Sequence, residues 1–181
     1  MIFRKTLFAV IFTFTAGFCF SHNQLPSGFK NIKLGMSVDE VKDALKKDVQ
    51  FGYRGDRDVS FLPGTTNVLI ETETSKNAPY SYLDRCWFQF YEEKLYVITI
   101  NIKTTKLDHY SVFSTLCNKY GIPPVFNPEK AQWSDSSVIM SLERPLTIKY
   151  TDKKTYDKIL EESRVESSAE EMTRESFLES L

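Results

Sequence analysis

The sequence predicts an α+β protein in which short helices pack on one face of a mainly antiparallel β-sheet. Three observations support this fold class. Apolar and polar residues alternate over residues 80–103, which is the pattern of a long β-hairpin. Apolar residues recur at helical spacing in two other segments, residues 37–47 and 106–120. Several short strand patterns follow each helical segment, so the helix-then-strands order occurs twice.

The first helix is predicted from a start signal. Ser37 and Glu40 form an S-x-x-E capping box, and apolar residues follow at Val38, Val41, Ala44 and Leu45. The apolar stripe is narrow, so we expect this helix to lie on a sheet rather than in a bundle. Strands are predicted at residues 59–62 and 67–74, separated by a Pro-Gly turn.

The strongest strand signal is the hairpin over residues 80–103, with its turn at Glu92 and Glu93. One face of this hairpin is more consistently apolar, and we expect it to face the helices. It carries Cys86, Phe88, Phe90, Ile98, Ile100 and Ile102.

The second helix is predicted over residues 106–120, because Gly121 is a typical C-terminal stop and two prolines follow. Three short strands are predicted after it, at residues 131–134, 137–142 and 146–150. The single α+β domain is therefore expected to span residues 22–151.

Residues 1–21 have the layout of a secretory signal peptide, with a basic start and an uncharged apolar run. Cleavage after Ser21 would leave His22 as the mature N-terminus. Lipidation of Cys19 is an alternative, although the bulky Phe18 precedes it, and an uncleaved anchor is another. The sequence thus predicts a periplasmic or secreted protein.

Residues 152–181 form an acidic tail with nine acidic and five basic residues. A helix is expected to continue to about residue 162, and disorder or a frayed helix beyond it, because few large apolar residues are available to offset the ordering entropy. The alternative is a helix that docks on a partner through Met172, Phe177, Leu178 and Leu181.

The composition predicts neither nucleic-acid binding nor a cofactor. The formal net charge is −1, without the cationic surplus that phosphate binding needs. No glycine-rich phosphate motif and no metal-ligand spacing occurs, so we expect no nucleotide, cofactor or metal site. The carboxylate pairs Asp56/Asp58, Glu71/Glu73 and Glu92/Glu93 are typical of solvated loops, faces and turns rather than of a catalytic pair.

Catalytic residues are not predicted either. His109 lies eight residues before Cys117 on the same helix, about 12 Å along the axis, which is too far for a nucleophile and its base. An enzyme of unrecognised type would require a cleft that gathers Asp84, Arg85 and His109.

Cys86 and Cys117 are predicted to form one disulfide between the hairpin and the second helix, since an exported chain folds in an oxidising compartment. Two buried thiols are the alternative.

Arg85, Trp87 and Tyr91 are expected on the hairpin face opposite the helices, where they could form a protein-binding patch. Ordinary packing of strand aromatics is the alternative reading.

A short motif carries a family resemblance. Residues 32–41, with the sequence IKLGMSVDEV, and the following Leu45 resemble the opening motif of the SmpA/OmlA-type lipoproteins of the β-barrel assembly machinery. They are also similar to the repeat of the β-lactamase-inhibitor-protein fold. The resemblance implies a tight turn at Gly35, a buried Met36 and helices against an antiparallel sheet.

These expectations together favour an exported, non-enzymatic protein-binding or scaffold protein of the cell envelope, whose partner is another envelope or extracellular protein. Membrane contact is expected only through an uncleaved signal segment. A secreted inhibitor of an enzyme is the first alternative, because the inhibitor-like resemblance permits it, and an enzyme of unrecognised type is the second.

Overall fold

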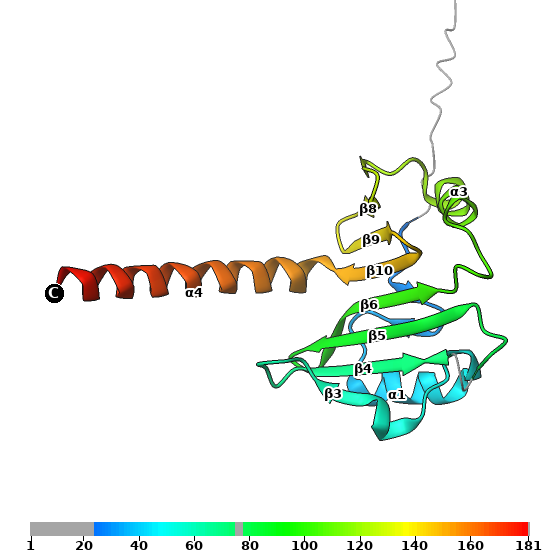
Figure 1. The fold of residues 1–181 in the computed structure, drawn as a ribbon, viewed down its shortest axis with the longest axis horizontal. Helices are drawn as coiled ribbons and strands as arrows, with labels where there is room; N and C mark the ends of the chain where they lie inside the picture. The colour runs from blue at the N-terminus through cyan, green and yellow to red at the C-terminus, as the bar shows by residue number, and fades with distance from the viewer. Residues whose placement is uncertain (1–23, 75–77, 181) are drawn as a thin grey trace, which may run out of the picture.

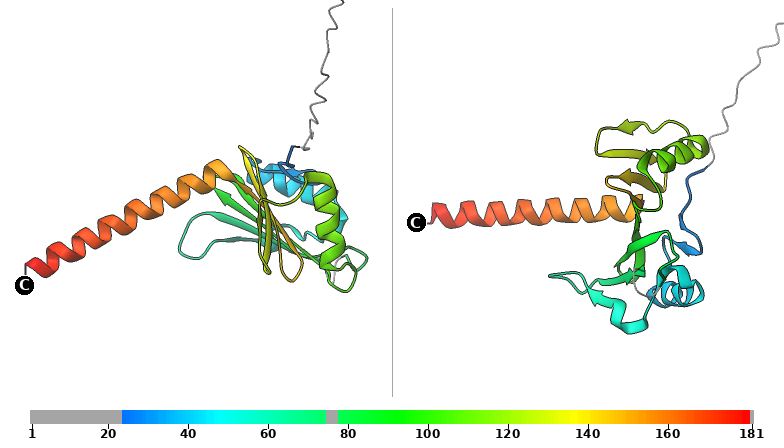
Figure 2. Two further views of the ribbon diagram at one scale, coloured as in Figure 1. Left: turned by 90° about the horizontal axis from the view of Figure 1, so that it is seen from above. Right: turned by 45° about the vertical axis from the view of Figure 1, so that its right-hand side comes forward.

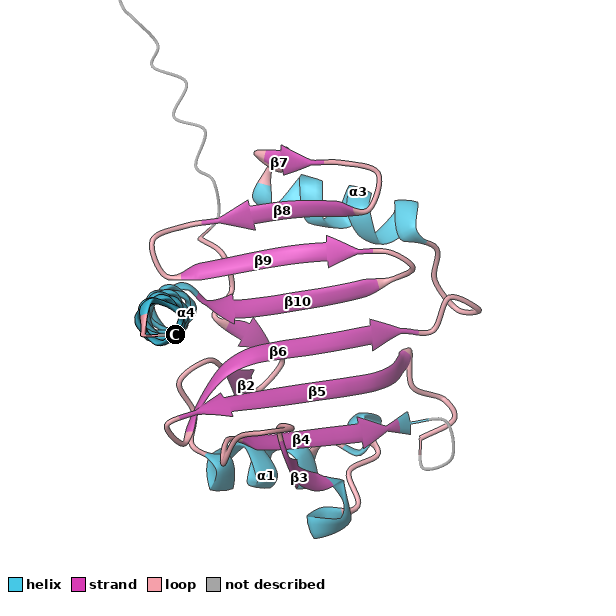
Figure 3. Ribbon diagram, turned by 60° about the vertical axis from the view of Figure 1, so that its left-hand side comes forward, coloured by secondary structure: helices cyan, strands magenta, loops and turns pink. Residues whose placement is uncertain are grey.

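The computed structural model describes residues 24–74 and 78–180, so the predicted signal peptide lies outside the described residues. The core of the structure is an eight-stranded antiparallel sheet with the strand order β3-β4-β5-β6-β10-β9-β8-β7 (Figure 1). Helices α1 and α3 lie behind one face of this sheet in Figure 3, and the opposite face is turned toward the viewer. The predicted α+β class is confirmed.

The domain consists of two similar halves, each with one helix followed by four strands. The first half contains α1 (Val38–Lys47), β3 (Val59–Phe61), β4 (Val68–Glu73), β5 (Leu83–Tyr91) and β6 (Lys94–Ile102). The second contains α3 (His109–Tyr120), β7 (Val125–Phe126), β8 (Lys130–Ser134), β9 (Val138–Glu143) and β10 (Thr147–Asp152). The halves join where β6 pairs with β10, and within them the two-residue strand β7 was not predicted from the sequence.

The N-terminal segment leads into α1 through two very short strands, β1 (Gly28–Phe29) and β2 (Ile32–Lys33). Gly35 has a φ of +85°, as the expected tight turn requires. The capping box is formed: the Glu40 amide donates to Ser37 Oγ at 3.4 Å, and the Ser37 amide donates to Glu40 Oε2 at 2.7 Å. Met36 is half-buried rather than fully buried.

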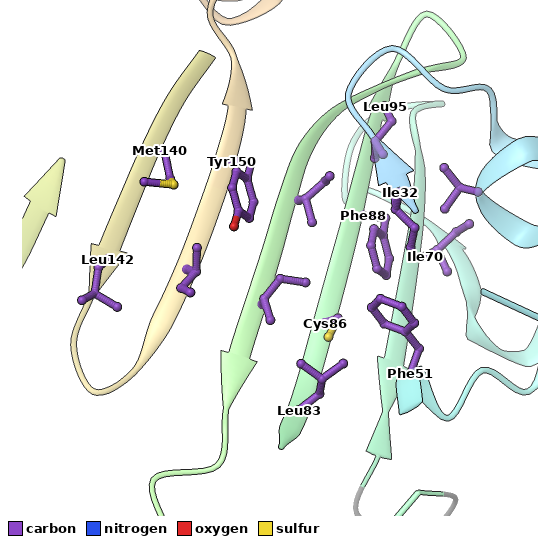
Figure 4. Packing of buried hydrophobic residues seen from close by; sticks show 14 of the residues in the cluster. Ile32, Phe51, Ile70, Leu83, Cys86, Phe88, Leu95, Met140, Leu142 and Tyr150 are labelled. Carbon is purple, nitrogen blue, oxygen red and sulfur yellow. The ribbon is translucent and has the colours of Figure 1, made fainter. Parts of the chain in front are cut away.

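The β5–β6 hairpin forms the centre of the core, as predicted. Its inward side chains pack against residues from α1 and from η1 (Val49–Phe51), the first of two 3-10 turns that follow α1 (Figure 4). The second turn, η2 (Gly55–Asp58), contacts β3 and β4 instead. Two irregularities alter the predicted alternation. Register shifts near both ends of β5 turn Leu83 and Leu95 into the core. Tyr96 therefore lies on the other face, where its ring contacts Tyr91.

Helix α3 begins at His109, later than predicted, because Asp108 caps it by accepting a hydrogen bond from the Ser111 amide at 2.9 Å. The helix ends at Gly121 as predicted, and the Gly121 carbonyl accepts a 2.8 Å hydrogen bond from the indole of Trp133. This bond and the contact of Phe113 with Trp133 hold α3 over the second half of the sheet.

One predicted solvated carboxylate is instead buried. The Asp58 side chain has no exposed surface, and it accepts hydrogen bonds from the amide, Nε and Nη2 of Arg54 at 2.6–2.8 Å. Its neighbour Asp56 is 94% exposed, as expected. The pair is thus split because η2 turns only one of its carboxylates inward.

The acidic tail is a helix over nearly its whole length. Helix α4 spans Lys153–Glu179 and is capped by Asp152, which accepts a hydrogen bond from the Thr155 amide. Where the sequence predicted disorder or fraying after residue 162, the structure continues the helix to Glu179. Neither α4 nor any other described helix is long and apolar enough to cross a membrane.

Candidate functional sites

The sheet face that α1 and α3 leave uncovered is called the open face. Arg85, Trp87 and Tyr91 all lie on it, because alternate residues of β5 point to opposite sides and their neighbours Cys86 and Phe88 are fully buried. These three residues therefore lie on the face opposite the helices, as predicted.

Arg85 and Trp87 form one cluster on this face. The Arg85 guanidinium carbon lies 5.9 Å from the centre of the Trp87 ring, a cation–π distance. Arg85 also forms ion pairs across the β4–β5 ladder, at 3.3 Å to Glu71 and 4.0 Å to Glu73. Its charge is thus opposed by two carboxylates, and Trp87 is the main apolar surface of the cluster.

Tyr91 lies at the far end of β5 and contacts the tail helix rather than Trp87. Its hydroxyl donates to Glu162 Oε2 at 2.6 Å. The Lys158 Nζ lies 5.1 Å from the centre of its ring and forms a 2.7 Å ion pair with Glu92. The hydrogen bond to Glu162, together with burial, raises the pKa of Tyr91. Tyr91 therefore anchors α4, a role that the sequence pattern did not indicate.

Helix α4 leaves β10 on the side of the open face and projects away from the sheet (Figure 2). From residue 163 on, every side chain described is exposed. Of the residues predicted for a docking helix, Met172, Phe177 and Leu178 are 71%, 64% and 52% exposed, and Leu181 lies outside the described residues. Met172 shares a helix face with Val165, seven residues earlier, whereas Phe177 and Leu178 point in other directions.

The structure does not contain the predicted disulfide, and Cys86 and Cys117 are free thiols. Cys86 is buried on β5 in the first half of the sheet, whereas Cys117 is on α3, which packs over β7 and β8 in the second half. Burial raises the pKa of Cys86 to about 12 and also raises that of Cys117. The disulfide prediction is therefore wrong, and the alternative of two buried thiols holds for Cys86 but not fully for Cys117, which is half-buried.

A cleft of about 470 Å³ lies between α3 and the hairpin formed by β7 and β8. Aromatic side chains supply its apolar walls, with Phe113 and Phe126 ring centres 5.5 Å apart. Titratable groups from three separate segments also line it, namely Asp108, His109, Lys130 and Arg144.

The cleft contains a histidine but no catalytic relay. The Asp108 carboxylate accepts hydrogen bonds from the Ser111 amide and, at 2.6 Å, from the Ser111 hydroxyl, so it orients α3 rather than His109. Burial, assisted by the nearby charge of Arg144, lowers the pKa of His109. The imidazole of His109 is thus biased toward its neutral form, and the Asp108 carboxylate is bonded to Ser111 rather than to His109.

The structure does not bring together Asp84, Arg85 and His109, the set that an enzyme was expected to need. Arg85 lies on the open face, Asp84 lines a depression near Lys103 and Pro145, and His109 lines the cleft under α3. Among the described residues, no group of three or more His, Cys, Asp or Glu side chains is arranged to hold a metal ion.

Sequence reasoning placed the open face but missed the cleft. Its lining comes from residues 108–113, 126–131 and 144, which are far apart in the sequence and have no shared motif. One local signal could have indicated the β7–β8 turn at the edge of the cleft. Asn127 is a residue type that starts Asx turns, and its side-chain oxygen accepts hydrogen bonds from the Glu129 and Lys130 amides.

The chain is an α+β protein with two halves, each of one helix and four strands. The strands of both halves form one sheet, and a C-terminal helix projects from it on the side of the open face. Residues 27–162 match the TP0088 domain, and the chain belongs to this family. The matched range covers both halves and ends at Glu162, the residue that Tyr91 binds. No curated protein and no solved structure matches the chain significantly.

Proposed function

We propose that the protein is an exported, non-enzymatic binding or scaffold protein of the cell envelope that holds another protein between its open sheet face and α4. The observation that carries the proposal is the fixed projection of α4 on the side of the open face (Figure 2). The Tyr91–Glu162 hydrogen bond and the Lys158–Glu92 ion pair attach the base of the helix, and the rest has exposed side chains.

The outer part of α4 has the features of a helix that needs a partner. Residues 163–179 span about 25 Å, and an isolated helix of this length is marginal in water. Val165 and Met172 expose apolar side chains on one face, and the segment has five acidic and two basic residues. A partner that presents an apolar strip with basic residues at its rim would complement it.

The open face offers a second contact for the same partner. One uncovered face is normal for an antiparallel sheet, so exposure alone is not an argument. Trp87, however, is a large aromatic beside a charged Arg85, and tryptophan and arginine are the residue types most enriched at the centres of interfaces.

The cellular location is part of the proposal. The basic start and apolar run of residues 1–21 favour export, and the partner would then be an envelope or extracellular protein. The resemblance to SmpA/OmlA-type lipoproteins and to the inhibitor-protein fold also stays a proposal. It is supported by the Gly35 turn and the completed Ser37–Glu40 capping box.

Site-specific photo-crosslinking in the native cell tests the proposal. A photoreactive residue would replace Trp87 on the open face or Met172 on α4, and Asp43 on the outer side of α1 would serve as the matched control. We expect one defined protein adduct that is common to positions 87 and 172 and absent at position 43. The proposal is wrong if neither position yields a defined adduct, or if the control yields the same one.

A further inference from the structure

The cleft between α3 and the β7–β8 hairpin is separate from the open face. At about 470 Å³ it is within the size range of small-molecule sites in proteins. It lies on the α3 side of the sheet, whereas Arg85 and Trp87 point to the other side. Protein binding at the open face therefore does not account for the residues that line this cleft.

Two aromatic walls of the cleft are exposed. Tyr110 and Phe126 are 76% and 66% exposed, and both line the concave site beside the partly buried Phe113. An apolar ligand that covered them in this concave site would gain transfer free energy in proportion to the apolar area removed from water. The walls fit an apolar body.

Arg144 supplies a guanidinium group whose two terminal nitrogens can still donate hydrogen bonds to a ligand. Its amide donates to the Glu129 carbonyl at 3.0 Å, and its Nε donates to the Pro128 carbonyl at 2.7 Å, so the side chain is held in place. Among the described residues, no acceptor pairs with its two terminal nitrogens. An arginine fixed in this way presents a ready fork of donors for a carboxylate.

The charge of the lining selects a monoanion. Hydrogen bonds from the Ser111 side chain and amide lower the pKa of Asp108, which is therefore ionised, whereas His109 is biased to the neutral form. Lys130 and Arg144 add two positive charges. The lining thus has one positive charge in excess, which a carboxylate would balance, whereas a doubly charged phosphate would leave one negative charge uncompensated.

We propose that this cleft binds a small amphiphilic carboxylate, whose apolar body lies against Phe126 and Tyr110 and whose carboxylate is bound by Arg144. The proposal is independent of the partner at the open face, because no residue is shared between the two sites.

The test is titration calorimetry of the full chain with sodium decanoate, with 1-decanol as the uncharged control. We expect saturable one-to-one binding of decanoate and at least about tenfold weaker binding of decanol, because the charge-assisted hydrogen bonds are lost. The absence of saturable binding, or equal affinity for the two compounds, would overturn the proposal.

Two matched pairs of variants locate the site. Arg144→Gln should weaken decanoate binding at least about tenfold, and Arg85→Gln, the same change on the open face, should leave it unaltered. Phe126→Ser should weaken it about fivefold, whereas Phe61→Ser, at an edge phenylalanine that is also 66% exposed, should not. If the Arg144 substitution disturbs the β7–β8 hairpin, the comparison of Phe126→Ser with Phe61→Ser still shows whether decanoate binds in the cleft. Equal affinities within that pair contradict the proposal.

Discussion

The Tyr91 hydroxyl donates a 2.6 Å hydrogen bond to Oε2 of Glu162, which lies 71 residues later in the chain. This contact joins the end of β5 to the third turn of α4. Beyond it the helix projects away from the sheet (Figure 2), and Glu162 is also the last residue of the family match.

Tyr91→Phe should loosen the base of α4 without unfolding the domain. The hydroxyl makes one charge-assisted bond at the surface, so its removal should lower the free energy of unfolding only slightly. Hydrogen exchange of the amides in residues 153–162 should accelerate, as measured by mass spectrometry. Tyr96→Phe, which removes a bond to Gln89 within the hairpin, is the control and should leave α4 exchange unchanged. Equal exchange in both variants would contradict the anchoring role.

Arg54→Gln should destabilise the domain strongly. The substitution leaves the fully buried Asp58 carboxylate with only a backbone donor, and an unpaired buried charge typically costs about 3 kcal/mol. Lys42→Gln breaks the neighbouring pair with the 94% exposed Asp56 and should cost less than about 0.5 kcal/mol. Urea denaturation of the two variants measures the difference, and similar losses would show that Asp58 is not an effectively buried charge.

Stability should fall as the pH drops through the range in which carboxylates become protonated. Burial alone would raise the pKa of Asp135, but hydrogen bonds from Ser137 and Val138 outweigh it and hold the pKa below its usual value. The unfolded chain then binds a proton at a higher pH than the folded chain, so stability present at neutral pH is lost below about pH 4. Asp135→Asn should be less stable than the parent at pH 7, and the difference between the two should narrow as the pH falls below about 4. A difference between the two that does not change with pH in urea titrations would refute this assignment.

The two cysteines should behave as free thiols of unequal reactivity. Because burial raises the pKa of Cys86 to about 12, iodoacetamide should not label it in the folded protein at neutral pH, and Cys117 should react slowly. Both should be labelled in urea without reductant, as read from peptide masses. Labelling that requires a reductant would mean that the thiols are paired.

Sequence patterning predicted most of the sheet because alternation is a strong signal wherever one face is buried. Of the six residues expected to point inward, five are completely buried and Ile102 is half-buried. Alternation failed at Leu83 and Leu95, since a register shift lies next to each of them and leaves no compositional mark. The shift next to Leu95 also explains why Tyr96 faces Tyr91 rather than the core.

The candidate sites were only partly predictable for a related reason. Local periodicity is enough to place Arg85 and Trp87 on the open face. The contact by which Tyr91 anchors Glu162 depends instead on the position of a helix that is distant in the sequence. The cleft depends on three segments meeting through the fold, and Arg144 gave no signal of its own in the sequence. The disulfide prediction failed because Cys86 is on β5 in the first half of the domain and Cys117 is on α3 in the second half. The spacing of cysteines in the sequence does not encode this separation.

The way in which β6 meets β10 suggests that the molecule is separable. Each half completes its own helix and its own run of neighbouring strands, and the two runs are linked in the sheet by one ladder between Val97–Asn101 and Thr147–Thr151. A nick in the exposed connection at Thr104 and Thr105 would leave each run of strands intact. Two such fragments, expressed apart, would have complementary edges through which to reassemble.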